Sequence, residues 1–91
     1  EQSAVEYQLL QNYPNPFNPI TTIGYTLPDR EHVRVAVMDI LGQEIAVLTD
    51  GIQEAGEHIV QWDAREMASG VYFYKLNAGR KSITRKMLLV R

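Results

Sequence analysis

The feature that most constrains the fold of this chain is an alternation of apolar and polar residues that recurs in short segments. Residues 21–27 and 33–38 each place an apolar side chain at every second position, on one face of an extended chain. Segments of this kind that are rich in β-branched and aromatic residues are typical of half-buried strands. Four further strands are predicted over residues 44–48, 58–62, 71–76 and 81–91.

Turn signals separate these segments at intervals of about ten positions. Residues 39–42 predict a tight reversal, because Asp39 can cap the turn's backbone and Gly42 accepts a positive φ. Residues 63–69 form a short polar crossover that could make one helical turn, and no segment has the pattern of an amphipathic helix. The sequence therefore predicts an all-β fold, a small immunoglobulin-like antiparallel β-sandwich of six to seven strands.

One predicted strand is apolar on both faces. Residues 71–76 carry a single charged side chain, Lys75. Because only a central position covers both sides of a strand, we expect this segment in the middle of its sheet. The chain contains no cysteine, so the disulfide of antibody domains and a thiol nucleophile are both excluded.

A proline-rich segment precedes the first long strand. Residues 12–19, which we call the strap, contain three prolines, and each proline fixes its own φ and favours extended geometry in the residue before it. We expect a stiff lead-in in which Tyr13 and Phe17 plug the edge of the sandwich. Residues 1–11 are predicted to be the end of a linker that joins the fold at Leu9 and Leu10, so the domain covers residues 12–91.

Length and composition limit the chain to one modest domain. Ninety-one residues are enough for one core but not for two domains. The chain begins at Glu1 without a signal segment, which leads us to expect a module of a larger polypeptide. The longest apolar run has four residues, far short of the roughly 18 needed to span a bilayer, so we expect no direct membrane insertion.

Charge is distributed unevenly along the chain. Residues 1–76 carry eleven acidic and four basic side chains, whereas residues 77–91 carry five basic and no acidic ones. Residues 86–91 hold an apolar quartet between two cations. In a strand, Met87 and Leu89 share one face while Leu88 and Val90 share the other. One face can pack while the other stays exposed, so this strand is either pinned into the sheet or displayed to a receptor.

The residues offer little chemistry for catalysis. His32 is predicted to lie at a solvated rim, and His58 to be a partly buried structural residue beside Val60 and Trp62. No nucleophile elbow or phosphate-binding glycine pattern is present, so we expect neither enzyme activity nor a cofactor. A calcium ion on turn carboxylates stays open as an alternative. The basic patch lacks a stacking platform, and no nucleic-acid partner is expected.

Five segments occur in an order that resembles a known family. They are Asn12–Pro19, Asp39–Ile45, Trp62–Asp63, Ala68–Leu76 and Arg85–Arg91. Together they are similar to the type A C-terminal sorting domain of the bacterial type IX (Por) secretion system, over about residues 9–91. Gln43 stands where that family often has arginine, which leaves the turn intact but puts a role for a cation there in doubt.

The resemblance implies that the chain is a non-catalytic address label. Proteins of this family carry an N-terminal cargo, pass through the periplasm, and reach the outer membrane surface or the extracellular space because the outer-membrane secretion machinery reads this domain. A sortase-like peptidase commonly removes the domain. By similarity, the residues tied to recognition by the machinery are Gly70, Tyr72, Lys86, Met87, Leu88, Leu89, Val90 and Arg91.

The terminal strand suggests how a receptor could recognise the domain. The terminal strand could offer a receptor main-chain hydrogen bonds by edge addition, with Lys86 and Arg91 fixing the register. Removal of residues 88–91 should then abolish export while most of the sandwich stays folded. The alternative is a structural immunoglobulin-like spacer, since Trp62–Asp63 with residues 69–72 also resembles a domain of the flagellar hook-capping protein.

Overall fold

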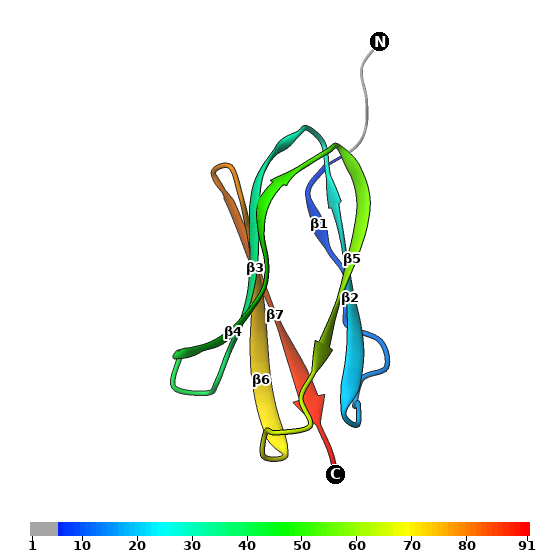
Figure 1. Cartoon of the computed structure of the whole chain (residues 1–91), viewed down its shortest axis with the longest axis vertical. Coiled ribbons are helices and arrows are strands. Elements are labelled where there is room, and N and C mark those ends of the chain that lie inside the picture. The colour runs from blue at the N-terminus through cyan, green and yellow to red at the C-terminus, as the bar shows by residue number, and fades with distance from the viewer. Residues whose placement is uncertain (1–5) are drawn as a thin grey trace.

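A computed structural model describes residues 6–91, which form a sandwich of seven strands in two sheets (Figure 1). The strands are β1 (Gln8–Leu9), β2 (Ile20–Leu27), β3 (Glu31–Met38), β4 (Glu44–Gln53), β5 (Gly56–Asp63), β6 (Gly70–Ala78) and β7 (Lys81–Leu89). They pair antiparallel in the orders β1-β2-β5 and β4-β3-β6-β7. The predicted all-β, immunoglobulin-like sandwich is confirmed.

The crossover between β5 and β6 is a turn rather than a helix. The amide of Met67 donates to the carbonyl of Ala64 at 2.9 Å, which closes one turn without continuing it. This is the single turn that the sequence allowed for residues 63–69, and it does not extend into a helix. Within residues 6–91, no helix is long and apolar enough to cross a membrane.

The core consists of the inward side chains that the alternation predicted. On β2 and β3, every second residue is fully buried between the sheets. These side chains are Ile23, Tyr25, Leu27, Val33, Val35 and Val37. A slip of one residue would turn each of them toward solvent, so burial of one face holds the register of the strands.

Strand β6 lies between β3 and β7, as the sequence predicted, but only one of its faces is covered. Tyr72, Tyr74 and Leu76 point into the core. Val71 and Phe73 point away from the three-stranded sheet and are only half-buried. The expectation that both faces are covered is wrong, because no second layer of residues 6–91 packs on the outer side of this sheet.

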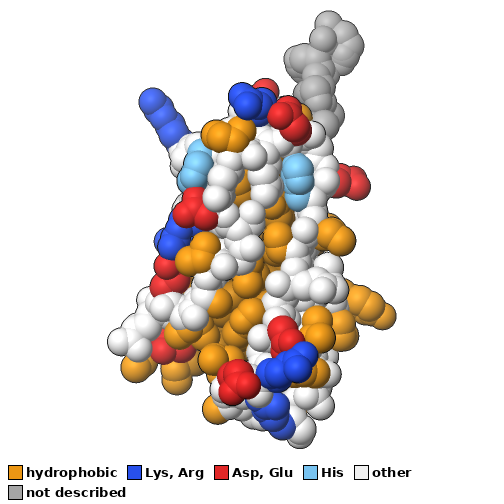
Figure 2. Space-filling model, in the orientation of Figure 1, with side chains coloured by type: hydrophobic (Ala, Val, Ile, Leu, Met, Phe, Trp, Pro, Cys, Tyr) orange, Lys and Arg blue, Asp and Glu red, His pale blue; other side chains and the backbone are white. Residues whose placement is uncertain are grey.

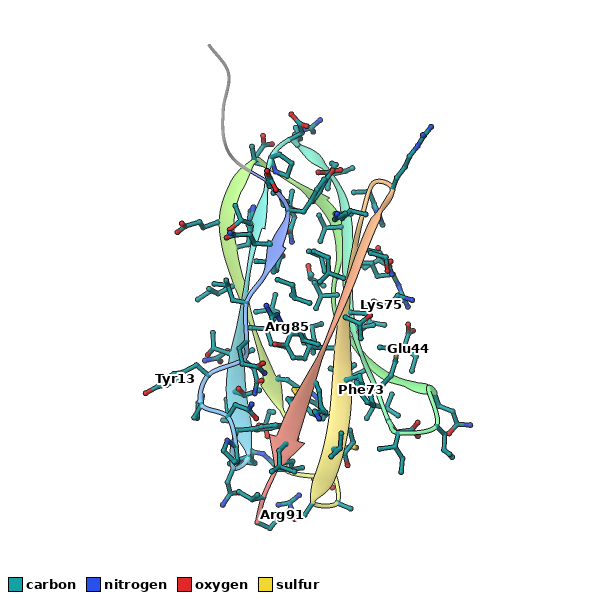
Figure 3. The ribbon with its side chains drawn as sticks, turned by 180° about the vertical axis from the view of Figure 1, so that it is seen from behind. Tyr13, Glu44, Phe73, Lys75, Arg85 and Arg91 are labelled. Atoms are coloured by element: carbon teal, nitrogen blue, oxygen red, sulfur yellow. The ribbon has the colours of Figure 1, made fainter. Side chains whose placement is uncertain are left out.

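The strap closes one edge of the sandwich through Phe17 and not through Tyr13. The Phe17 side chain is 1% exposed, and its ring lies 5.8 Å from that of Trp62. Tyr13 is 80% exposed and points into solvent (Figure 3). The expectation that both aromatic rings plug the edge is therefore correct for Phe17 and wrong for Tyr13.

The residues just before the strap also join the fold, as expected. Leu9 is buried in β1, and the Leu10 amide donates to the carbonyl of Gly24 at 2.9 Å. The hydroxyl of Tyr74 donates to the Leu10 carbonyl at 2.7 Å and accepts from the Asn12 amide at 2.8 Å. One core tyrosine thus ties the beginning of the chain to β6.

Two buried phenols make the stability of the fold sensitive to alkaline pH. Burial raises the pKa of Tyr25 and the pKa of Tyr74 above the usual tyrosine value. Because the unfolded chain ionises first, their contribution is complete below about pH 10 and is lost as the pH rises from there through the folded pKa values. Urea midpoints should fall above about pH 10, and less steeply in Tyr74→Phe than in the wild type. Equal slopes in the two proteins would contradict this assignment.

Candidate functional site

The two candidate segments, around Gly70 and along residues 86–91, are neighbours in space. Gly70 pairs with Leu89, and Tyr72 pairs with Met87, where β6 and β7 run antiparallel. Both lie at the end of the sandwich where the C-terminus emerges (Figure 1). The sheet thus brings together segments that are more than a dozen residues apart in the sequence.

Gly70 and Tyr72 contribute to the structure of this end of the sandwich, Gly70 through its backbone conformation and Tyr72 through buried contacts. Gly70 has a φ of 151°, a backbone conformation that side-chain-bearing residues rarely adopt. The Tyr72 ring meets Trp62 edge-to-face at 5.3 Å, and its hydroxyl donates to the Ala68 carbonyl at 2.6 Å. Tyr72 is buried, so in the folded domain it supports the site without reaching the surface.

The apolar quartet of the terminal segment divides between the two faces of the sheet. Met87 and Leu89 are buried in the core. Leu88 and Val90 keep 38% and 41% of their surface exposed on the outer side. This confirms the predicted division into a packed and an exposed face, and it limits direct contact by a folded-state partner to the outer side chains.

The outer edge of β7 is already occupied where edge addition was expected. The Phe17 amide donates to the Leu88 carbonyl, and the Val90 amide donates to the Phe17 carbonyl, both at 3.0 Å. The Leu88 amide donates to Oδ1 of Asn15, also at 3.0 Å. Because the strap uses these main-chain groups, the hypothesis that a receptor pairs with them in the folded domain is wrong.

Lys86 and Arg91, the two cations on either side of the apolar quartet, have different surroundings. The Arg91 guanidinium donates to the carbonyls of Ala64, Arg65 and Met67, which holds the end of the chain against the β5–β6 turn (Figure 3). The Lys86 ammonium is exposed, and it makes no ion pair or side-chain hydrogen bond with any residue in the range 6–91. Of the two cations, Lys86 is the one available to a partner.

Sequence reasoning missed Asn15 and Arg85 at this site, and it expected Phe17 at an edge of the sandwich without identifying β7 as its partner. Asn15 and Phe17 hold the edge of β7, and Arg85 points between the sheets and donates to the Leu9 carbonyl (Figure 3). The prolines signalled that the strap is stiff, but not where it docks. Docking against a strand some seventy residues away leaves no local pattern in the sequence.

A second charged cluster lies on the same sheet. The Arg34 guanidinium makes a bidentate pair with Glu44, with both N–O distances 2.5 Å, and lies 3.6 Å from Asp50. The hydrogen bonds from Arg34 lower the pKa of Glu44. His32 is exposed and lies 2.8 Å from Asp50, which confirms its rim position. Arg34 thus offsets the charge of Glu44 and part of the charge of Asp50.

Neither histidine belongs to a metal or catalytic cluster in the described part of the chain. His58 stacks on Tyr25 with ring centroids 5.4 Å apart, and its Nε2 lies 2.7 Å from the Glu54 carbonyl oxygen. This confirms the prediction of a partly buried structural residue. Across residues 6–91, no three histidine, aspartate or glutamate side chains lie close enough together to hold a metal ion.

Comparison with known protein families decides what this arrangement belongs to. A family model described as "Secretion system C-terminal sorting domain" matches residues 11–90. The chain belongs to this family. The sorting domain is a C-terminal signal for type IX secretion, so it implies an interaction with that machinery, an attached N-terminal cargo, and export across the outer membrane to the cell surface or the extracellular space.

A solved structure with the same fold comes from a component of that system. The sorting domain is similar to a chain of PorZ, described as an essential bacterial surface component of the type IX secretion system of Porphyromonas gingivalis. The likeness has a TM-score of 0.58 at 24% sequence identity, and it covers 93% of the sorting domain but 11% of the PorZ chain. At this identity it supports the fold alone. No curated protein matches the chain.

Proposed function

We propose that the sorting domain acts as a folded, non-catalytic tag that outer-membrane components of the type IX machinery recognise. Its cargo passes through the periplasm, and a sortase-like peptidase then removes the domain. The family match over residues 11–90 is the observation that carries this function. The exposed outer side chains of β7 and the hydrogen bond between His58 Nε2 and the Glu54 carbonyl support a binding role over a catalytic one.

Within the tag, we assign different tasks to the residues that sequence similarity marked. Lys86, Leu88 and Val90 face outward and would contact the machinery directly. The other five, Gly70, Tyr72, Met87, Leu89 and Arg91, hold the terminal strand in place through backbone geometry, burial or hydrogen bonds. The domain is thus proposed to be recognised as a folded surface.

A reporter fusion tests this function. We expect a periplasmic reporter carrying residues 1–91 at its C-terminus to appear outside cells that possess the type IX machinery. The same fusion should remain in the periplasm of an otherwise identical strain that lacks the machinery, and the reporter alone should stay inside in both. Retention of the fusion in the competent strain would instead favour a structural spacer.

Truncation is a poor test of recognition in this domain. Removing residues 88–91 deletes the fully buried Leu89 and the groups that pair with Phe17. Loss of one buried leucine side chain typically costs about 2–5 kcal/mol. The expectation that most of the sandwich survives this deletion conflicts with that burial, so point substitutions at outward positions separate recognition from folding better.

A further inference from the structure

Three sequence segments that are far apart meet on the outer face of the four-stranded sheet. Residues paired directly across strands share a face, and the register pairs Val71 with Leu88, and Phe73 with both Met38 and Lys86. Val90 lies on this side by alternation along the terminal strand. We call Met38, Val71, Phe73, Leu88 and Val90 the outer patch.

The outer patch is an apolar surface that residues 6–91 leave open. Leu88 and Val90 are exposed, while Met38, Val71 and Phe73 are half-buried by their neighbours within the sheet. The β3–β4 hairpin leans away from the sandwich beside the patch, with exposed Ile40 and Leu41 at its tip (Figures 1 and 2). Contiguous apolar surface of this kind marks an interaction site.

Two lysines border the patch, and one carboxylate, Glu44, lies opposite its member Met38 across the β3–β4 pair. Lys86 lies opposite Phe73 across the β6–β7 pair, and Lys75 lies two residues along the same face of β6 (Figure 3). Within residues 6–91, neither lysine makes an ion pair. Glu44 lies near Lys75 but is already bound by Arg34. Besides the hydrogen bonds from Arg34, the charge of Lys75 also lowers the pKa of the Glu44 carboxyl, so Lys75 is partly compensated. Lys86 is the border charge that makes no such contact within residues 6–91.

The outer face of the other sheet carries acidic side chains. Its outward positions on β2 and β5 include the exposed Ile59, the carboxylate of Glu57, and Asp63, which is paired with Arg65 of the following turn at 2.6 Å; neither strand holds a lysine or arginine. Within residues 6–91, both faces of the sandwich thus carry exposed apolar residues, but lysines lie beside the outer patch and not on the strands around Ile59. A partner with carboxylates around an apolar strip complements the patch and not the opposite face.

We propose that the export machinery docks a protein surface on the outer patch, and that this surface presents an apolar strip bordered by carboxylates. The inference rests on the proposed function and names its contact surface. Burial of the patch supplies affinity, while Lys75 and Lys86 attract and orient the partner. Because the patch exists only when β3, β6 and β7 are paired, the signal is a folded surface assembled from three segments.

The test compares three charge substitutions in the reporter carrying residues 1–91. Leu88→Glu and Lys86→Glu alter the patch and its border, whereas Ile59→Glu is a matched control on the opposite face at a residue 73% exposed. We expect export to fall about tenfold or more for the first two, and to stay within about twofold for the control. Thermal unfolding of each purified domain should stay within a few degrees of the wild type.

The possible outcomes separate this inference from the proposed function. Export of the wild type together with undiminished export of Leu88→Glu and Lys86→Glu overturns the docking surface and leaves the secretion role intact. Equal loss in all three variants also overturns it. If the wild-type fusion is not exported, the proposed function itself fails. Sedimentation of residues 1–91 adds one more check, since a dimer dissolved by Leu88→Glu would assign the patch to a second copy and overturn the proposal.

Discussion

Replacing Phe17 with alanine is expected to lower the free energy of unfolding by about 3–5 kcal/mol, the range for truncating a buried aromatic ring. The side chain is almost completely buried and packs against Trp62. Its backbone also pairs with Leu88 and Val90, so a cavity beneath it weakens the contact that holds the terminal strand. In Phe17→Ala, hydrogen exchange of the Val90 amide should accelerate more than hydrogen exchange of the β2 amides.

Urea denaturation of Phe17→Ala and of Tyr13→Ala measures this effect with an internal control. Both positions are aromatic residues of the strap, but Tyr13 points into solvent. Its replacement should change the free energy of unfolding by no more than about 0.5 kcal/mol. Similar losses in the two variants would mean that the strap acts only through its stiffness, and not through the docking of one ring.

The second large effect is expected for Tyr74→Phe, which removes one oxygen from the core. This hydroxyl donates to the Leu10 carbonyl and accepts from the Asn12 amide. The aromatic ring stays in place after the substitution. A buried polar group left without a partner costs about 1–3 kcal/mol. The Asn12 amide is buried and the Leu10 carbonyl only partly so, and we therefore expect a loss of about 2–4 kcal/mol, below the sum for two fully buried groups. The substitution should mainly weaken the attachment of Leu10 and Asn12 to β6.

A matched phenylalanine substitution at Tyr72 controls for the change in chemistry. The Tyr72 hydroxyl donates to the Ala68 carbonyl and has no second hydrogen-bond partner among residues 6–91. Its removal should therefore cost about 0.5–1.5 kcal/mol, clearly less than Tyr74→Phe. Chemical denaturation of both variants at neutral pH decides the comparison. A larger loss at Tyr72 would show that the Tyr74 hydroxyl does not anchor the strap region.

These contacts connect the cargo side of the domain with its terminal strand. The strap and the residues just before it hold the outer edge of β7 through Asn15, Phe17 and the Lys86 carbonyl, which accepts from Nε2 of Gln11 at 2.9 Å. A change in the strap therefore reaches the terminal strand directly. Loss of export in strap variants is informative only when the stability of the domain is measured alongside.

Much of the fold could be predicted from local pattern alone. The alternation over β2 and β3 determined which side chains face the core, because a strand has only two faces. The Asp39–Gly42 reversal also followed from residue chemistry: the Asp39 carboxylate accepts from the Leu41 and Gln43 amides at 2.9 and 3.0 Å, and Gly42 has a φ of 83°.

The candidate site was predicted less completely. The residue types along β7 and their division between two faces followed from the alternation. The covering of its edge by the strap, the capture of Arg91 by three carbonyls and the burial of Tyr72 against Trp62 did not. Each of these contacts joins residues that lie in different segments, and their local sequence carries no trace of the partner.

By itself, the sequence determined that the chain forms alternating strands with reversals between them, and which face of each strand is apolar. Only the tertiary structure decided which strands become neighbours. That order places Met38, Phe73 and Leu88 on one face that no other part of residues 6–91 covers, and it leaves Phe17, not Tyr13, to seal the edge. The physical reason is that alternation is a property of the extended backbone, whereas neighbours are selected by the summed burial and hydrogen bonding of the whole chain.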